Sequence, residues 1–248
     1  MRSFDQTHLV FLILTAMFYA VTMFAAGKLS RKGQNVMFFL GALVCAAGIF
    51  FRYGMDLNFS GKLDLFPLAT QMMQVCNFNF LLVLLMLVPK FELARQYSVM
   101  FSMFAACTYM FSLPTSFASC NWYDVTVLNS WLNHTFAIAL PLWMVAAGRL
   151  KPKKEYIVPV TAAVALYFIA VYGCTEWLHA TGQLPTDTTF SFVYSPDGVP
   201  LLEWLYAMIP VPFFYLVPLA VPMLAFFWLL TRLFQNYKVS PYSRKIKV

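Results

Sequence analysis

The sequence predicts an all-α membrane protein, a bundle of seven transmembrane helices forming a single domain over residues 1–248. Three observations support this fold class. Hydrophobic residues make up 61% of the chain, and charged residues only 11%, against about 25% in an ordinary soluble domain. Seven apolar stretches come close to the roughly 20 residues that a helix needs to cross a bilayer. The charged residues lie between these stretches, with opposite signs on the two sides of the predicted membrane.

A bilayer admits only helices or closed barrels as spanning structures, and these stretches are too long and too continuous for the short strands of a barrel. The first stretch also exceeds the 7–15 apolar residues of a signal-peptide core, so we expect it to be a retained helix. The last contains four prolines, which predict kinks. In chain order the predicted spans are 8–27, 35–51, 65–88, 97–113, 127–148, 156–178 and 205–230.

The basic residues set the predicted orientation. Fourteen of the 17 Lys and Arg lie after the first, third and fifth stretches or in the C-terminal tail, whereas Arg2, Arg52 and Lys62 lie on the other side. By the positive-inside rule, the N-terminus is outside and the C-terminus cytoplasmic, in a multi-pass protein of the cell membrane. The net charge of +7 then reflects topology and attraction to anionic headgroups, and no nucleic-acid partner is expected.

The third stretch carries polar residues all round its predicted helix. At 100° per residue these residues do not share one face, so the helix should lie in the middle of the bundle. The amides either line a functional site or join neighbouring helices, and both interpretations are open. The residues are Thr70, Gln71, Gln74, Cys76, Asn77 and Asn79.

The fifth stretch gathers Asn129, Ser130, Asn133 and His134 on one face, within about 140° of arc. Polar groups at such a face usually meet the bundle interior or a cavity. His134 and Cys76 are predicted at compatible depths, about two and three turns below the outer boundary. They are candidates for a base and a nucleophile. A buried cysteine is also commonly a small core residue, and a histidine an interhelical hydrogen-bond partner.

Two features of the outer side are further candidates. Arg52 is four residues before Asp56, with which it would pair, or it holds a lipid phosphate. The long outer segment, about 179–204, is either a passive connector or a lid. Neither a metal nor another cofactor is expected, because the three histidines are widely separated and no cofactor-binding motif occurs.

Two familiar classes of seven-helix protein do not fit the sequence. A retinal protein needs a lysine in its last helix, and the stretch 205–230 contains none. A G-protein-coupled receptor is disfavoured, because an Asp-Arg-Tyr-like triplet is missing after the third stretch and an Asn-Pro-x-x-Tyr motif from the seventh.

Three segments resemble the YwaF family of integral membrane proteins, a bacterial group whose eukaryotic relatives include a membrane acyltransferase. They are Gln74-Val75-Cys76-Asn77 in the third stretch, Asn133-His134-Thr135-Phe136 in the fifth, and the aromatic and proline-containing run over 190–215. The separation of Cys76 and His134 by 58 residues is also similar to that in the acyltransferase relatives.

The resemblance implies a lipid acyltransferase or acyl hydrolase with membrane phospholipid as its partner. Cys76 would attack an acyl ester with His134 as base, and amides of Gln74, Asn77 or Asn133 would stabilise the oxyanion. One alternative is a transporter or binding protein for a small or lipid-like solute, with Arg52 holding an anion. Another is a non-enzymatic structural membrane protein. A Cys76–His134 distance within about 4 Å favours the enzyme. The oligomeric state stays open.

Overall fold

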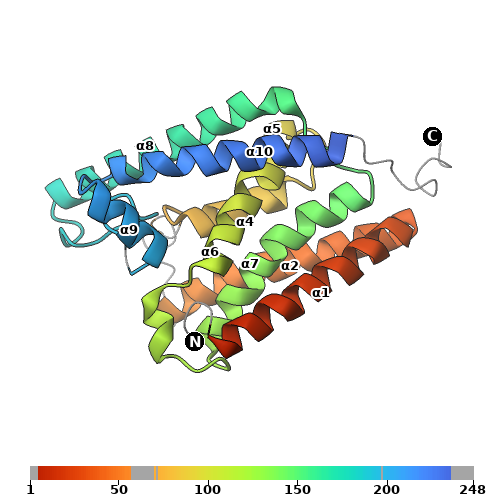
Figure 1. Cartoon of the computed structure of the whole chain (residues 1–248), viewed down its shortest axis with the longest axis horizontal. Coiled ribbons are helices and arrows are strands. Elements are labelled where there is room, and N and C mark those ends of the chain that lie inside the picture. The colour runs from red at the N-terminus through yellow and green to blue at the C-terminus, as the bar shows by residue number, and fades with distance from the viewer. Residues whose placement is uncertain (1–4, 57–69, 71, 197, 236–248) are drawn as a thin grey trace.

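The computed structural model describes residues 5–56, 70, 72–196 and 198–235, with residues 49–56 and 235 described by their backbone alone. Every regular element in these ranges is helical, which confirms the predicted all-α class. In Figure 1, α1, α2 and α7 form one side of the bundle, α8 and α10 form the other, and α4 and α6 lie between them. The long helices are α1 (Gln6–Lys28), α2 (Arg31–Asp56), α7 (Val125–Ala146), α8 (Ile157–Ala180) and α10 (Ala220–Gln235). The shorter ones are α4 (Val75–Leu85), α9 (Pro200–Met208), and the continuous series α5 (Glu92–Tyr97), η1 (Ser98–Ser102, π-helical) and α6 (Met103–Phe111).

Three helical segments of the described chain are long and apolar enough to cross a membrane: Gln6–Lys28, Lys154–Ala180 and Phe214–Phe234. Large side chains of α1, such as Ile13 and Phe24, are 60% and 69% exposed. Apolar side chains exposed along a whole helix would be unfavourable in water, and they match a helix surrounded by lipid.

The third apolar stretch is not one continuous helix, so the prediction of a helix over 65–88 is wrong at its centre. Residues 72–74 form a turn, and α4 begins only at Val75. The Met73 carbonyl group, which does not continue a helix, accepts hydrogen bonds from the Tyr167 hydroxyl, at 2.9 Å, and from the Ser191 hydroxyl. A break inside an apolar segment is tolerated where other protein groups satisfy the backbone in this way. Residues 68–88 contain neither glycine nor proline, and Pro67 lies five residues before the turn.

The last stretch is also divided, and here prolines supply the cause. The predicted helix over 205–230 consists of α9, a 3-10 segment η4 (Phe214–Leu219) and α10. Pro210 and Pro212 fall between α9 and η4, where their missing N–H groups prevent a continuous helix. Phe213 between them and η4 has a left-handed φ of 66°.

Helix α7 packs against α1, α2, α4 and α6. Asn133 and His134 on α7, and Asn77 and Asn79 on α4, are all buried. Asn133 and His134 on the polar face of the fifth stretch thus meet protein, and α4, the described helix of the third stretch, is packed among other helices, as predicted.

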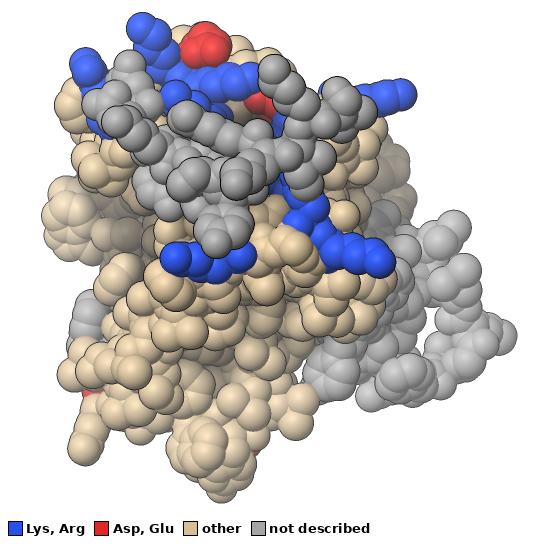
Figure 2. All heavy atoms as spheres, turned by 90° about the vertical axis from the view of Figure 1, so that its right-hand side faces the viewer, with Lys and Arg blue, Asp and Glu red and all other residues tan. Residues whose placement is uncertain are grey.

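Basic residues gather at one end of the molecule, which faces the viewer in Figure 2. The same end carries only two of the described acidic residues, Glu92 and Glu155. The opposite end, where α9 lies in Figure 1, carries five described acidic residues, Asp5, Asp124, Glu176, Asp187 and Glu203. The basic end consists of Lys28, Arg31, Lys32, Lys90, Arg95, Arg149, Lys151, Lys153, Lys154 and Arg232.

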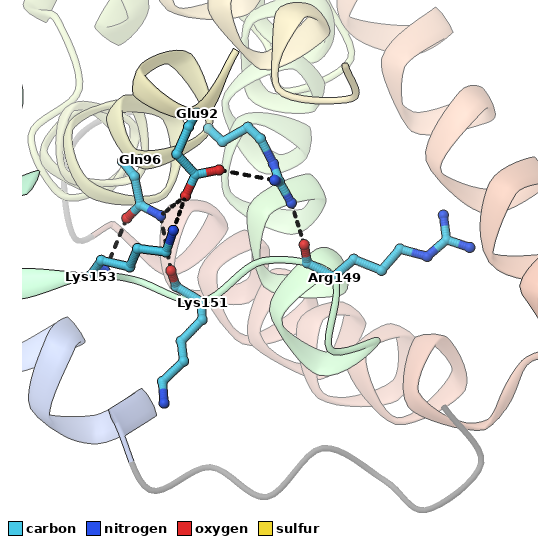
Figure 3. Close-up of polar contacts among 6 residues, drawn as sticks. Glu92, Gln96, Arg149, Lys151 and Lys153 are labelled. Atoms are coloured by element: carbon cyan, nitrogen blue, oxygen red, sulfur yellow. Dashed lines mark hydrogen bonds and ion pairs between the residues drawn. The ribbon is translucent and has the colours of Figure 1, made fainter. Parts of the chain in front are cut away.

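Glu92 joins α5 to the connection between α7 and α8 (Figure 3). Its carboxylate accepts from Arg95 Nη1 at 3.0 Å and from Lys153 Nζ at 2.8 Å. Gln96 adds two bonds, from its Nε2 to the Lys151 carbonyl oxygen and from Lys153 N to its Oε1. Burial raises the pKa of Glu92, but the hydrogen bonds from Lys153 and Gln96 and the charges of Arg95 and Lys153 outweigh it, so the pKa is lowered.

We expect acidification to destabilise the protein through Glu92. Because the folded-state pKa of Glu92 lies below the ordinary value of 4.5, its stabilising effect is fully present above that value and is lost as the pH falls through the folded pKa. Glu92→Gln should lower the Tm at neutral pH, and its Tm should fall less than that of the wild type between about pH 5 and 3. Glu155→Gln is the control, measured by thermal unfolding in detergent. An unchanged pH dependence in Glu92→Gln would contradict this assignment.

Candidate functional site

Cys76 and His134 are in direct contact. The distance between Cys76 Sγ and His134 Nε2 is 3.1 Å, a hydrogen-bond distance for this pair of atoms. The two residues are brought together by the packing of α4 against α7. His134 is 4% exposed and Cys76 is half-buried, so the pair is shielded on the histidine side and accessible on the thiol side. A thiol and an imidazole in such contact form the basic unit of cysteine nucleophiles.

The second ring nitrogen of His134 defines its protonation pattern. Nδ1 lies 2.7 Å from the carbonyl oxygen of Ser130, one turn earlier in α7. A carbonyl oxygen can only accept, so Nδ1 carries the proton. In the neutral imidazole, Nε2 is then the acceptor, and it faces the Cys76 thiol. This is the tautomer that a general base requires at this position.

Two aromatic rings hold the imidazole in place. Tyr109 of α6 stacks on His134 with ring centroids 3.6 Å apart and an interplanar angle of 10°. Phe80 of α4 meets the imidazole edge-on at 5.6 Å. The Tyr109 hydroxyl is 2.6 Å from Ser130 Oγ, which links the stacking ring to the same turn of α7. Nothing in the sequence singles out Tyr109, since a tyrosine in an apolar helix is commonly a core residue.

Cys76 lies in the first turn of α4, directly after its N-cap residue Gln74 and Val75. The break at residues 72–74 thus moves Cys76 from the middle of a predicted helix to the start of an observed one. The N-terminus of a helix carries a positive partial charge, which favours a thiolate over a thiol. A continuous helix over 65–88 would have offered no such environment.

The long outer segment folds over this helix start. Ser191 N donates to Gln74 Oε1 at 3.3 Å, and Ser191 Oγ donates to the Met73 carbonyl oxygen. Tyr167 OH lies 3.0 Å from Ser191 Oγ and joins the same network. Ser191 and Phe192 have φ values of 49° and 63°, in the left-handed region that non-glycine residues rarely adopt. Such strain persists where the surroundings enforce it and is concentrated at functional sites.

An apolar cavity of about 280 Å³ opens beside Cys76. Its walls come from α6, α8, α9, η4 and α10, together with Phe192 of the outer segment. Phe104, Phe168 and Met223 are typical of the lining, and none of the described residues that line it is charged. A cavity with these walls suits a hydrocarbon chain, whereas a polar solute would lose its hydration there without compensation.

The other predicted site residues lie at different places relative to Cys76, His134 and the cavity. Asn133 Nδ2 donates to Asn129 Oδ1 at 3.2 Å, and the Asn133 side chain packs against Gly48 of α2. Asn77 is buried and is not among the residues that line the cavity. Arg52 belongs to the final turns of α2, where side chains lie outside the described part of the structure. Gln74, Asn77 and Asn133 all lie outside the cavity lining, and of the three only Gln74 is at the helix start beside Cys76, where its Oε1 accepts from Ser191 N.

We expect Gly48→Ala to destabilise the protein because of Asn133. A Cβ at residue 48 would lie 2.0 Å from Asn133 Nδ2 and 2.4 Å from its Cγ, so the buried Asn133 side chain must move or α2 must shift. Such overpacking costs about 1–3 kcal/mol of the free energy of unfolding. Gly173→Ala in α8 is the matched control, because its Cβ would meet nothing within 4 Å. Equal Tm values for the two variants in detergent would show that α2 and α7 do not touch at Asn133.

Comparisons of the chain with protein-family models, with curated proteins and with solved structures found no match. Within the chain itself, the described residues combine a half-buried thiol, an imidazole in the tautomer of a base, a helix N-terminus and an apolar cavity.

Proposed function

We propose that this protein is a lipid acyltransferase or acyl hydrolase in which Cys76 is the nucleophile and His134 the general base, acting on an acyl ester of a membrane phospholipid. The observation that carries the proposal is the 3.1 Å contact between Cys76 Sγ and His134 Nε2, with Nδ1 donating to the Ser130 carbonyl. The apolar cavity beside Cys76 supports an acyl chain as the group that is bound.

The first half of the reaction forms a thioester. His134 Nε2 accepts the thiol proton, and Cys76 Sγ attacks the ester carbonyl carbon. The carbonyl π electrons move to the oxygen and form a tetrahedral oxyanion. When that intermediate collapses, the ester C–O bond breaks, and His134 returns its proton to the leaving lysolipid oxygen.

The second half releases the acyl chain. A lysolipid hydroxyl or a water molecule loses its proton to His134 Nε2 and attacks the thioester carbon. The C–S bond then breaks, and the departing Cys76 thiolate regains the proton from His134. With a lysolipid acceptor the protein is an acyltransferase, and with water it is an acyl hydrolase.

Gln74 and the start of α4 are the proposed stabilisers of the oxyanion. Ser191 N occupies Gln74 Oε1, which leaves the donating end of the Gln74 amide as the group available to an anion. The positive partial charge at the N-terminus of α4 acts in the same direction. Asn133 packs between α7 and α2, so we assign it no part in this step.

We propose further that the chain is a member of the YwaF family and crosses the cell membrane seven times. The spans are α1, α2, the segment containing α4, the segment formed by η1 and α6, α7, α8 and the segment from η4 to α10. The N-terminus lies outside and the C-terminus in the cytoplasm, because the basic end shown in Figure 2 then faces the cytoplasm. This orientation places Cys76 and the cavity in the outer half of the membrane.

A carrier or binding protein for a lipid-like solute is the second candidate, because the apolar cavity alone would serve it. Purified protein in vesicles of phosphatidylcholine and phosphatidylethanolamine, supplied with a lysolipid of distinct mass, separates the two. Acyl transfer to the lysolipid, or release of free fatty acid, supports the enzyme. Lipid that copurifies in stoichiometric amount and is never converted supports the carrier.

We expect Ala105→Phe to narrow the cavity and to discriminate against long acyl chains. Ala105 of α6 is part of the cavity lining, so a phenyl ring there takes space from the bound chain. Transfer of a 16-carbon chain should fall by about tenfold or more, while transfer of an 8-carbon chain falls less. Ala162→Phe, at an exposed position of α8 outside the lining, is the control. Equal losses of transfer rate for the two chain lengths would show that the cavity does not bind the acyl chain.

A further inference from the structure

A second cavity, of about 390 Å³, lies at the basic end, remote from Cys76. It is formed where the connection between α7 and α8 meets the last turns of α10. Four basic residues line it, Lys151, Lys153, Lys154 and Arg232, against one acidic residue, Glu155. Its volume falls within the range of about 300–1,000 Å³ that is usual for small-molecule sites.

The positive charge of this cavity is not balanced by its surroundings. Lys153 is paired with Glu92, but no described carboxylate lies within 4 Å of the side-chain nitrogens of Lys151, Lys154 or Arg232. Figure 3 shows the Lys151 side chain directed away from Glu92, whereas Lys153 points toward it. Residues 236–248 contain four more Lys and Arg and neither Asp nor Glu, so their side chains do not supply the missing negative charge.

The cavity has an apolar border on its α10 side. Trp228 lines it and is 55% exposed, and the Arg232 guanidinium lies over its ring at 5.3 Å from the centroid. Leu229 and Leu233, on the same turns of α10, are 47% and 62% exposed. Tryptophan and arginine side by side at the end of an apolar helix are typical of the membrane–water interface. The cavity is therefore basic on one side and borders the acyl-chain region on the other.

We infer that this cavity binds the phosphate group of an anionic phospholipid in the leaflet at the basic end of the molecule. The unpaired charges of the cavity sum to about +2, from Lys151, Lys154 and Arg232 against Glu155. This positive charge matches the negative charge of a phosphomonoester. The exposed apolar side chains of α10 would meet the acyl chains of the same lipid. The site uses none of the residues proposed for acyl transfer and does not depend on that proposal.

The test measures the Tm of purified protein in uncharged detergent during titration with three probes: dioctanoyl phosphatidic acid, dioctanoyl phosphatidylcholine and inorganic phosphate. A ligand that binds only the folded protein raises the Tm. We expect phosphatidic acid to raise it, and phosphatidylcholine and free phosphate at the same concentration to raise it little. Lys151→Gln/Arg232→Gln should weaken the response to phosphatidic acid at least about tenfold.

Two further variants keep this result interpretable. Lys28→Gln/Lys32→Gln removes the same charge from exposed positions at the same end, and it should bind phosphatidic acid as the wild type does. Lys151→Arg/Arg232→Lys retains the charge and should also retain binding. Equal losses in the two glutamine double variants would mean diffuse attraction and overturn the site. An equal response to free phosphate and to phosphatidic acid would overturn its assignment to a lipid.

Discussion

Replacement of Cys76 by alanine is expected to lower acyl transfer by at least about 10³-fold, because the thioester cannot form without the sulfur atom. Cys76→Ser keeps the size and a hydroxyl group, but a hydroxyl is a far weaker nucleophile than a thiolate, so a large loss is expected there as well. Both variants should fold, since Cys76 is half-buried in the first turn of α4. The measurement is the rate of lysolipid and acyl-product formation in vesicles.

Cys174→Ala is the control for these variants, because Cys174 is an exposed cysteine of α8 outside the cavity. It should transfer acyl chains at the wild-type rate. Full activity in a folded Cys76→Ala variant is incompatible with a thioester mechanism. The cavity would then be the binding site of a lipid carrier.

His134→Gln is expected to lower the same rate by about 10²–10⁴-fold, the usual contribution of a positioned base. The glutamine amide can still bond to its neighbours, but it cannot accept the thiol proton. Combining it with Cys76→Ala should add little further loss, since the two residues act as one unit. The double variant is therefore expected to have about the activity of Cys76→Ala alone.

The control for the histidine is His179→Gln. His179 lies at the C-terminal end of α8, where its Nε2 is 3.1 Å from the Thr188 carbonyl oxygen, and it does not line the cavity. It should keep the wild-type rate. A pH–rate profile adds a second readout: the wild type should show a rise in rate with deprotonation of the dyad, and His134→Gln should lose that limb. A pH–rate profile that is the same in His134→Gln as in the wild type would exclude His134 as the base.

Much of the fold follows from composition and periodicity. Hydrophobic stretches predict α1, α7 and α8 to within a few residues, because long apolar runs favour long helices and the charged residues beside them mark where each helix stops. The interior position of α4 also follows from its polar residues, which cannot all avoid lipid unless the helix is surrounded by protein.

The break before α4 could not be read from the sequence. It depends on Tyr167 and Ser191, which are 94 and 118 residues away along the chain and satisfy the Met73 carbonyl group. Local pattern gives no sign of such distant partners. The four prolines in the stretch 205–230 predict an irregular helix. They do not by themselves predict that α9 is a separate helix.

The site was partly predictable. Cys76 and His134 stand out because a thiol and an imidazole at compatible depths are uncommon in apolar helices. Their contact, the tautomer set by Ser130 and the stacking of Tyr109 depend on how α4, α6 and α7 pack. The cavity is likewise a product of tertiary packing, because its walls come from segments spread over 150 residues of the chain.

The most direct test of the central claim is detection of the acyl-enzyme itself. Purified wild-type protein would be incubated with phosphatidylcholine of defined acyl chains without an acceptor, quenched in acid, digested and analysed by mass spectrometry. We predict a peptide containing Cys76 with the mass of one acyl chain, which hydroxylamine removes, and which is absent from Cys76→Ala and depleted in His134→Gln. Lipid turnover by the wild type without any acylation of Cys76 would contradict the mechanism.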